Sequence, residues 1–465
     1  MLTENEMRAQ GALAPEALGA ALAATPGADD WQVETLRDEE AQVYLIGDRV
    51  EAVRAVTNER ARVTVHNDHT PRDSEMGERA RGMTTVTLLA SDAADPARLA
   101  QRLGDAVTVA SLTDNPSFGL PEPPAQGYPA VETADPALEG AVGAALQETM
   151  ARLRAAAARE QNVRLSSAEL FVTRTARTLR NSRGVAGESL GTRVMLDFVL
   201  IARDAGGREA EFHGEFTRRR LEDLLVEGTV AAYATFARHS LDATTPATYE
   251  GPVVLSGEAI AGMFNPGLGL GGPYAFHTSA EAAYQKLSRL APGEAITGEE
   301  PRGDRLTLLS DPLRPFGAQS NAFDGEGLPA ARLALIEESV LARRWADTRY
   351  ATYLGVPATG AFANVTVLPG TWDLAALRSA TEGSVYEIVA FSFMNPDPIS
   401  GDFVAEIKLG YRHGATGTQP IKGGSLAGNV FAAFADARLS RATYSDGTYY
   451  GPAAVRFGLL TIAGA

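Results

Sequence analysis

The chain has 465 residues, of which 45% are hydrophobic and 22% are charged, as in globular proteins with an extensive core. A formal net charge of −16 disfavours binding to nucleic-acid phosphates or to an anionic membrane, because both depend on lysine and arginine. The chain contains no cysteine, which excludes disulfide bonds and fits a reducing compartment. Without a long apolar run or the pattern of a signal peptide near its start, we expect a soluble, cytoplasmic protein.

The first third of the sequence predicts a mixture of helices and short strands. A helix is expected at Ala12–Ala24, and Pro26-Gly27 would end it. Asp95 followed by Pro96 is typical of an N-cap and a first helical residue, opening a helix to about Leu103. Alternating Val and Thr residues predict four strands at Gln42–Ile46, Arg49–Asn58, Arg60–His66 and Met83–Ala90, and Ser117–Pro129 is expected to be a loop.

The next segment carries the clearest helical pattern of the chain. Within Asp135–Gln161, apolar residues recur every three or four positions, at Leu138, Val142, Leu146, Met150 and Leu153. An antiparallel meander of three strands should follow, and after it a second amphipathic helix. These elements are expected at Glu169–Leu179, Thr192–Ala202, Arg208–Thr217 and, for the helix, Arg220–Arg238.

Beyond a connection at Asp242–Gly251, the sequence becomes rich in glycine and in short strand-like segments. We therefore expect an α+β fold with an N-terminal α/β domain at residues 1–245 and a mostly antiparallel β domain at 246–465. The predicted strands of the second domain include Arg305–Leu309, Phe362–Leu368, Val385–Phe393 and Phe403–Tyr411.

Several short motifs occur in a characteristic order. They include the turn Asn181-Ser182-Arg183-Gly184, the strand-like Pro252–Leu255 with the apolar segment Gly257–Phe264, and Phe323-Asp324-Gly325-Glu326-Gly327. Ser400-Gly401-Asp402-Phe403 and Leu426-Ala427-Gly428-Asn429 follow near the end. Together these segments resemble the TldD/PmbA family of bacterial and archaeal proteases.

In the catalytic branch of that family, the segment after the apolar helix ends in a His-Glu-x-x-x-His zinc site. The corresponding positions here are Asn265, Pro266 and Leu270, none of which can bind zinc as an imidazole does or act as a general base. The resemblance therefore points to the TldE/PmbA-like branch, with no metal or cofactor on this chain.

What the resemblance implies is a non-catalytic subunit that pairs with a TldD-type zinc metallopeptidase and helps to degrade or process unfolded peptides. Zinc is then expected on the partner of this heterodimer. The candidates for residues that face the cavity or the partner are Asn265, Gly267, Gly269, Gly272 and His413.

Two other functions remain open. Gly187-Glu188-Ser189-Leu190-Gly191 fits the G-x-S-x-G pattern of serine hydrolases, although the strand-like residues after it favour a flexible turn over a nucleophile elbow. The chain could instead be a stand-alone homodimeric protein that binds peptides.

Four further motifs have ordinary structural interpretations. Gly267-x-Gly269-x-x-Gly272 follows an expected helix, whereas a dinucleotide fingerprint follows a strand. His66 with His69 could bind a metal, but such pairs are more often solvated loop residues. We expect Asp397 and Asp402 to satisfy turn backbone groups, and Arg218-Arg219-Arg220 to form the polar start of a helix.

Overall fold

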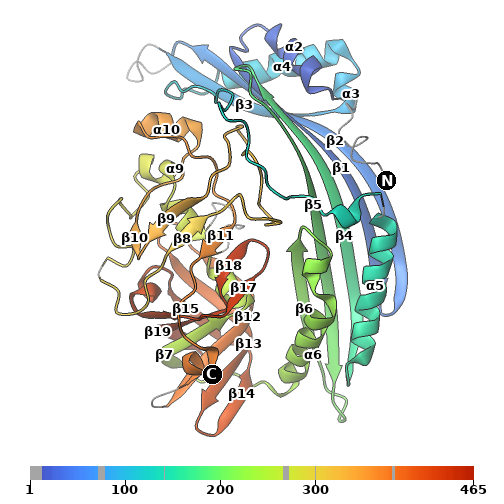
Figure 1. Ribbon diagram of the computed structural model, residues 1–465, viewed down its shortest axis with the longest axis vertical. Helices are drawn as coiled ribbons and strands as arrows, with labels where there is room; N and C mark the ends of the chain where they lie inside the picture. The colour runs from blue at the N-terminus through green and yellow to red at the C-terminus, as the bar shows by residue number, and fades with distance from the viewer. Residues whose placement is uncertain are drawn as a thin grey trace.

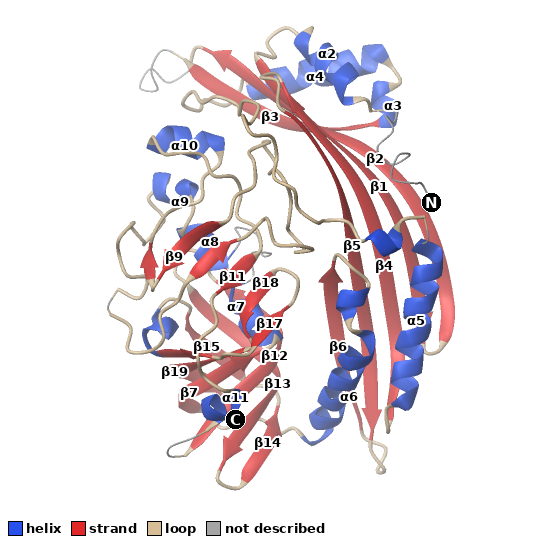
Figure 2. Ribbon diagram, in the orientation of Figure 1, coloured by secondary structure: helices blue, strands red, loops and turns tan. Residues whose placement is uncertain are grey.

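The computed structural model describes residues 13–71, 79–140, 142–264, 272–298, 300–379 and 383–464. The chain forms one long curved sheet and, facing it, two smaller sheets built from the C-terminal half (Figures 1 and 2). This arrangement confirms the α+β fold class. Within the described ranges, no helix is long and apolar enough to cross a membrane.

The long sheet has six strands in the order β3-β2-β1-β4-β5-β6, and every neighbouring pair is antiparallel. Its strands are β1 (Asp30–Ile46), β2 (Arg49–His69), β3 (Ala80–Leu89), β4 (Val163–Asn181), β5 (Ala186–Arg203) and β6 (Glu209–Arg218). The three-stranded meander predicted after the long helix is therefore confirmed as β4–β6.

The prediction of separate strands at Arg49–Asn58 and Arg60–His66 is wrong, because both belong to β2. Likewise, Gln42–Ile46 is only the end of β1. The polar middle of β1 conceals the strand in the sequence, since its carboxylates pair with arginines of neighbouring strands. Glu34 accepts hydrogen bonds from Arg62 at 3.1 Å and from Arg177 at 2.6 Å.

Helices cover this sheet at two places. At one end, α2 (Pro15–Ala23), α3 (Ala90–Ala93) and α4 (Pro96–Ala110) pack on β1–β3, and Asp95 caps α4 as predicted. Farther along, α5 (Val142–Arg159) and α6 (Val226–Asp242) lie beside each other on β4–β6 (Figure 1). All five apolar residues of the predicted stripe are buried: Leu138, which lies in the short helix η2 (Pro136–Leu138), and Val142, Leu146, Met150 and Leu153.

Five strands of the C-terminal half close on themselves as a small barrel, in the order β12-β7-β19-β15-β13, because β12 also pairs with β13. The barrel strands are β7 (Tyr249–Ser256), β12 (Ser384–Pro396), β13 (Asp402–Gly414), β15 (Ser425–Asn429) and β19 (Ala454–Ala463). Two further strands extend it, β14 (Gly417–Ile421) and β16 (Ala437–Leu439).

A second sheet of this half has the order β10-β9-β8-β11-β18-β17. Its strands are β8 (Leu308–Ser310), β9 (Leu333–Glu337), β10 (Val340–Leu341), β11 (Val365–Val367), β17 (Thr443–Ser445) and β18 (Tyr449–Pro452). The remaining helices are η3 (Glu222–Leu224), α7 (Glu258–Phe264), α8 (Gly272–His277), α9 (Ala280–Tyr284), α10 (Thr348–Leu354), α11 (Leu374–Arg378) and η4 (Ala432–Asp436).

The chain passes from the long sheet and its helices to the C-terminal sheets between Asp242 and Tyr249. This crossing falls within the connection at which the two predicted domains, 1–245 and 246–465, were divided. Most strand pairs of the second half are antiparallel, and the described exceptions are β7 with β12 and β11 with β18.

Candidate functional site: the cleft between the two halves

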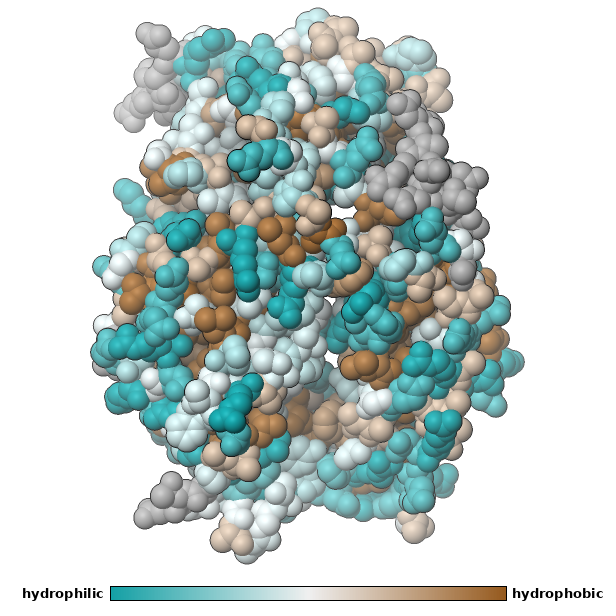
Figure 3. Space-filling view, viewed as in Figure 1, coloured by the Kyte–Doolittle hydropathy of each residue, from teal (hydrophilic) through white to brown (hydrophobic). Residues whose placement is uncertain are grey.

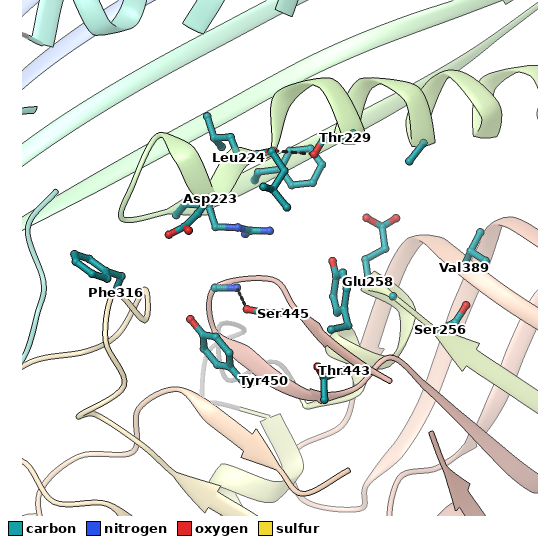
Figure 4. A pocket seen from close by; sticks show the side chains of 18 of the residues that line it. Asp223, Leu224, Thr229, Ser256, Glu258, Phe316, Val389, Thr443, Ser445 and Tyr450 are labelled. Atoms are coloured by element: carbon teal, nitrogen blue, oxygen red, sulfur yellow. Dashed lines mark hydrogen bonds between the residues drawn. The ribbon is translucent and has the colours of Figure 1, made fainter. Parts of the chain in front are cut away.

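A cleft of about 1440 Å³ lies between the long sheet and the C-terminal sheets. One wall comes from β6, η3 and α6, and the other from the loop 311–316, the start of α7, β12 and the β17–β18 hairpin. The molecular surface is hollowed along this line (Figure 3), and side chains of both walls point into the space between them (Figure 4).

Arg219 fastens the two walls together. Its Nε and Nη2 atoms donate to carbonyl oxygens of the C-terminal half, those of Gly317 at 2.7 Å, Ala318 at 3.2 Å and Ser320 at 2.7 Å. Its Nη1 donates to carbonyls of its own half, of Thr133 and Thr192. Burial lowers the pKa of this guanidinium to about 10, and the five hydrogen bonds offset part of the cost of burying it.

The Phe-Asp-x-Glu-Gly segment forms a second fastening between the halves. The ring of Phe323 is fully buried, and the guanidinium of Arg177 lies 4.5 Å from the ring centre. The same guanidinium donates hydrogen bonds to the carbonyls of Phe323 and Asp324. Strand β5 has glycine where this ring packs, since a Cβ atom on Gly187 would stand 2.9 Å from Phe323. The motif therefore serves to dock the C-terminal half on the long sheet.

Two carboxyl groups of this segment are nearly enclosed. Asp324 accepts hydrogen bonds from the backbone N–H groups of Glu326 and Leu328, both at 2.9 Å. Glu326 accepts from the N–H and the hydroxyl of Thr348, at the start of α10. Burial raises the pKa of Glu326 to about 7, and the nearby carboxylates of Asp324 and Asp347 add to the shift.

On the floor of the cleft, the first residue of α7 is Glu258. One of its carboxylate oxygens accepts a hydrogen bond of 2.8 Å from the hydroxyl of Tyr233 on α6. Burial raises the pKa of Glu258, and the hydrogen bond from Tyr233 and the charges of Lys408 and His213 oppose that shift. In Figure 4 the carboxylate extends from α7 toward α6.

A buried ion network lies behind the wall formed by β12. Glu387 is 1% exposed and accepts two hydrogen bonds from Arg378, at 2.7 and 2.8 Å, one from Ser256 and one from His413 at 2.9 Å. Burial alone would raise the pKa of Glu387, but these hydrogen bonds hold it at about 2. The carboxylate is therefore ionised and saturated, which fits a supporting role better than proton transfer.

The structure places only part of the predicted site. Asn265, Pro266, Gly267, Gly269 and Leu270 lie outside the described residues. Gly272 begins α8 with a φ of 73°, a conformation that favours glycine. His413 contacts Glu387, a lining residue of the cleft, and its other ring nitrogen lies 3.0 Å from the hydroxyl of Thr418.

The serine-hydrolase hypothesis does not fit the geometry of its motif. Ser189 lies inside β5, opposite Arg177 of β4, and the strand continues to Arg203 without turning into a helix. The prediction of a flexible turn at Gly187–Gly191 is therefore also wrong. Packing accounts for both glycines, because a Cβ atom on Gly191 would stand 2.8 Å from Arg219.

The two-histidine hypothesis fails for a similar reason. His66 and His69 lie three positions apart in β2, so their side chains leave opposite faces of the sheet. His66 is buried, which lowers its pKa to about 4, and His69 forms a 2.8 Å contact with Asp114. Asp397 accepts hydrogen bonds from Ile399 and Ser400 N–H groups, as expected of a turn residue.

Sequence reasoning missed Arg219, Glu258 and Glu387. The Arg218–Arg220 run was expected to begin a helix, but Arg218 ends β6 and α6 begins only at Val226. A single acidic residue opening an otherwise apolar helix was the available signal for Glu258. For Glu387 the signal was a charge inside the apolar strand Val385–Phe393, which predicts a buried partner.

The fold is shared with solved structures. A structure of TldE from Thermococcus kodakarensis superposes with a TM-score of 0.77 at 19% sequence identity, covering 98% of this chain and all of that one. This chain is therefore an α+β protein whose two halves enclose a cleft, with the same architecture as that TldE structure.

Residues 138–241 match the PmbA/TldA metallopeptidase central domain, and residues 248–464 match the PmbA/TldA metallopeptidase C-terminal domain. Because these matches span most of the chain, it belongs to the TldD/PmbA family.

Two curated relatives match part of the chain, and one of them carries the family's name. The Metalloprotease PmbA of Escherichia coli O157:H7 is 25% identical over 262 residues, which are 54% of each chain. An uncharacterized protein of Methanocaldococcus jannaschii is 28% identical over 198 residues, 41% of this chain and 45% of the relative. The chain thus spans about half the length of the curated relatives that it matches.

Proposed function

We propose that this chain is the non-catalytic, TldE-like subunit of a heterodimeric zinc metalloprotease that degrades or processes unfolded peptides. The observation that carries the proposal is the sequence after α7. Where the catalytic branch has histidine, glutamate and histidine, this chain has Asn265, Pro266 and Leu270. The likeness to the fold of a TldE structure supports the same assignment.

The donor chemistry of this segment does not fit zinc. Structural and catalytic zinc sites use imidazole, thiolate or carboxylate ligands, usually three or four of them. Helix α7 carries one acidic residue, Glu258, and no histidine, and Glu258 is engaged by Tyr233. Among the described residues there is no group of three or more His, Asp or Glu side chains placed to hold a metal ion.

In this proposal the TldD-type partner supplies the zinc and the hydrolytic chemistry in the cytoplasm. The present chain supplies the second half of the enclosure and stabilises the catalytic subunit, so that only extended chains enter. Obligate pairing of this kind is expected to bury about 2,000 Å² or more of surface in total.

The test is a reconstitution. This chain, purified alone, is expected to hold no zinc above background and to cleave no unfolded peptide, such as reduced and carboxymethylated casein. Mixed with a TldD-type subunit from the same cell, it should form a heterodimer of equal stoichiometry with greater peptidase activity than the partner alone. Zinc content, by elemental analysis, and the mass of the complex, by light scattering, report the two steps.

Stoichiometric zinc on the lone chain would contradict the non-catalytic assignment. A homodimer that stays intact in the presence of the partner would instead support the second candidate, a stand-alone peptide-binding protein.

A further inference from the structure

Residues 323–328, the docking segment, contact both the long sheet and α10. Side chains of the N-terminal half donate hydrogen bonds to backbone carbonyls of this segment: Gln32 to Gly325, Arg177 to Phe323 and Asp324, and Tyr128 to Gly327. These bonds use no carboxylate of the segment. The attachment to α10 differs in kind, because it is made by groups that titrate.

Carboxyl groups hold the docking segment to α10. Glu326 accepts hydrogen bonds from the N–H and the hydroxyl of Thr348, the first residue of α10, at 2.8 and 2.7 Å. Asp347 caps the same helix and accepts a hydrogen bond of 2.7 Å from the N–H of Tyr350. Asp324 and Asp347 are both close enough to act on Glu326 electrostatically. Three carboxyl groups therefore meet where the docking segment contacts α10.

The negative charge of this cluster is poorly compensated. Asp347 is close to a fourth carboxylate, Glu281 of α9, and Arg349 of α10 opposes the effect of these charges on Asp347. Within the described part of the chain, neither Glu326 nor Asp324 forms an ion pair. Backbone N–H groups and Thr348 are thus their main support, and a buried carboxylate without a cation is costly.

Ionisation of Glu326 should therefore weaken its contact with α10. Burial raises the pKa of Glu326 from an ordinary 4.5 to about 7, and it also raises the pKa values of Asp324 and Asp347. The contact is strongest below about pH 4.5, loses strength as the pH rises to about 7, and changes no further above that pH. A charged Glu326 that leaves α10 regains its hydration.

We propose that the docking segment is a pH-dependent latch. At acidic pH the protonated Glu326 holds the segment closed on α10, and above neutral pH the charged Glu326 favours an open segment that has left α10. Opening weakens the packing of Phe323 against Gly187 of β5, which is one of the two fastenings between the halves. Arg219 provides the other, so the two halves remain joined while the segment opens.

The latch goes beyond the proposed function and does not rest on it. It involves neither zinc nor a TldD-type partner, and all its residues belong to this chain. Latch opening and heterodimer formation can therefore fail independently of each other.

The test is amide hydrogen exchange on the intact chain, under conditions where exchange reports the opening equilibrium. After correction for the intrinsic effect of pH on exchange, the protection of 323–328 and of the first turn of α10 should fall about tenfold between about pH 6 and pH 8. That factor follows from a Glu326 that titrates near 7 when closed and near 4.5 when open. Helix α5 is the internal reference, and its corrected protection should not change.

Two variants assign the effect to Glu326 and its partner. Glu326→Gln keeps an acceptor for Thr348 and cannot ionise, so the protection of the docking segment should be the same at both pH values. Thr348→Val removes a hydroxyl that favours the charged form, so the loss of protection should shift to higher pH. Glu337→Gln, at an exposed position of β9, is the matched control and should behave as the parent chain.

Three results would overturn the proposal. One is equal protection of the docking segment at both pH values in the parent chain. Another is a loss that α5 shares to the same extent, because that would report global unfolding. The third is a pH dependence that persists in Glu326→Gln. None of these results would affect the reconstitution with the partner.

Discussion

Glu326 is a carboxyl group whose surroundings disfavour its charge. It lies against the first turn of α10, where Thr348 donates two hydrogen bonds to it, and Asp324 and Asp347 are close by. Its pKa rises from an ordinary 4.5 to about 7. The folded chain therefore keeps a proton on Glu326 over a pH range in which the unfolded chain has lost it.

The contribution of Glu326 to stability should consequently fall by roughly 1–3 kcal/mol as the pH rises from about 4.5 to 7. Buried His66 and His277, whose pKa values are lowered to about 4, act in the opposite direction over the same range, so the effect of Glu326 is read from the difference between two proteins. Glu326→Gln keeps an acceptor for Thr348 and has no charge, so its stability above about pH 7 should exceed that of the parent chain. Thermal midpoints measured across this pH range, for both proteins, give the difference.

Glu337→Gln, on an exposed position of β9, serves as the control and should follow the parent chain at every pH. Parallel pH profiles for Glu326→Gln and the parent would show that Glu326 titrates normally.

Element by element, the long sheet owes its shape to contacts that cross between distant strands. Strand β1 pairs with β2 and with β4, although β4 begins more than 100 residues later in the chain. The charged middle of β1 has the sequence pattern of a loop. It forms a strand because arginines on both neighbouring strands form ion pairs with its carboxylates. In contrast, four of the five apolar residues of the predicted stripe lie within α5, so the sequence predicted this helix directly, although Leu138 belongs to the separate η2 and α5 begins only at Val142.

Strand β5 should tolerate no side chain at Gly187, because the ring of Phe323 fills that space. Gly187→Val is expected to destabilise the protein by roughly 1–3 kcal/mol and to lower its thermal midpoint. It should also expose the 323–328 segment to limited proteolysis.

Gly104→Ala provides the matched control within α4, where a Cβ atom meets open space. That change should stabilise the helix by about 0.5–1 kcal/mol, because glycine costs conformational entropy. An unchanged midpoint for Gly187→Val would contradict the docking role assigned to Phe323.

Across the whole molecule, the cleft exists because a few contacts hold the long sheet and the C-terminal sheets at a fixed separation. Arg219 joins three carbonyls of one half to two of the other, and Phe323 packs against Gly187 of β5. The hydroxyl of Tyr233 reaches Glu258 across the cleft floor, and Lys422 donates to the carbonyl of Ser240.

Replacing Arg219 should therefore loosen the whole molecule. Arg219→Met removes five hydrogen bonds, of whose acceptors Thr133 and Gly317 keep a backbone donor, and is expected to cost roughly 2–4 kcal/mol. The radius of gyration, measured by X-ray scattering, should increase while the far-ultraviolet circular dichroism stays close to that of the parent. Arg219→Lys should recover only part of the loss, because an ammonium group has three donors and lacks the planar fork.

The exposed Arg49→Met is the control and should change neither quantity measurably. A compact, fully stable Arg219→Met protein would show that the remaining contacts suffice to hold the cleft.

The sequence by itself determined the α+β class, the long amphipathic helix, the N-cap at Asp95, the β-rich second half and the family, because each rests on local pattern or on ordered motifs. It did not reveal the continuous strands β1 and β2, the role of Arg219 or the ion network around Glu387. Those features depend on which groups meet across large separations in the chain. The role of a buried charge can be assigned only when the groups that surround it in the folded structure are known.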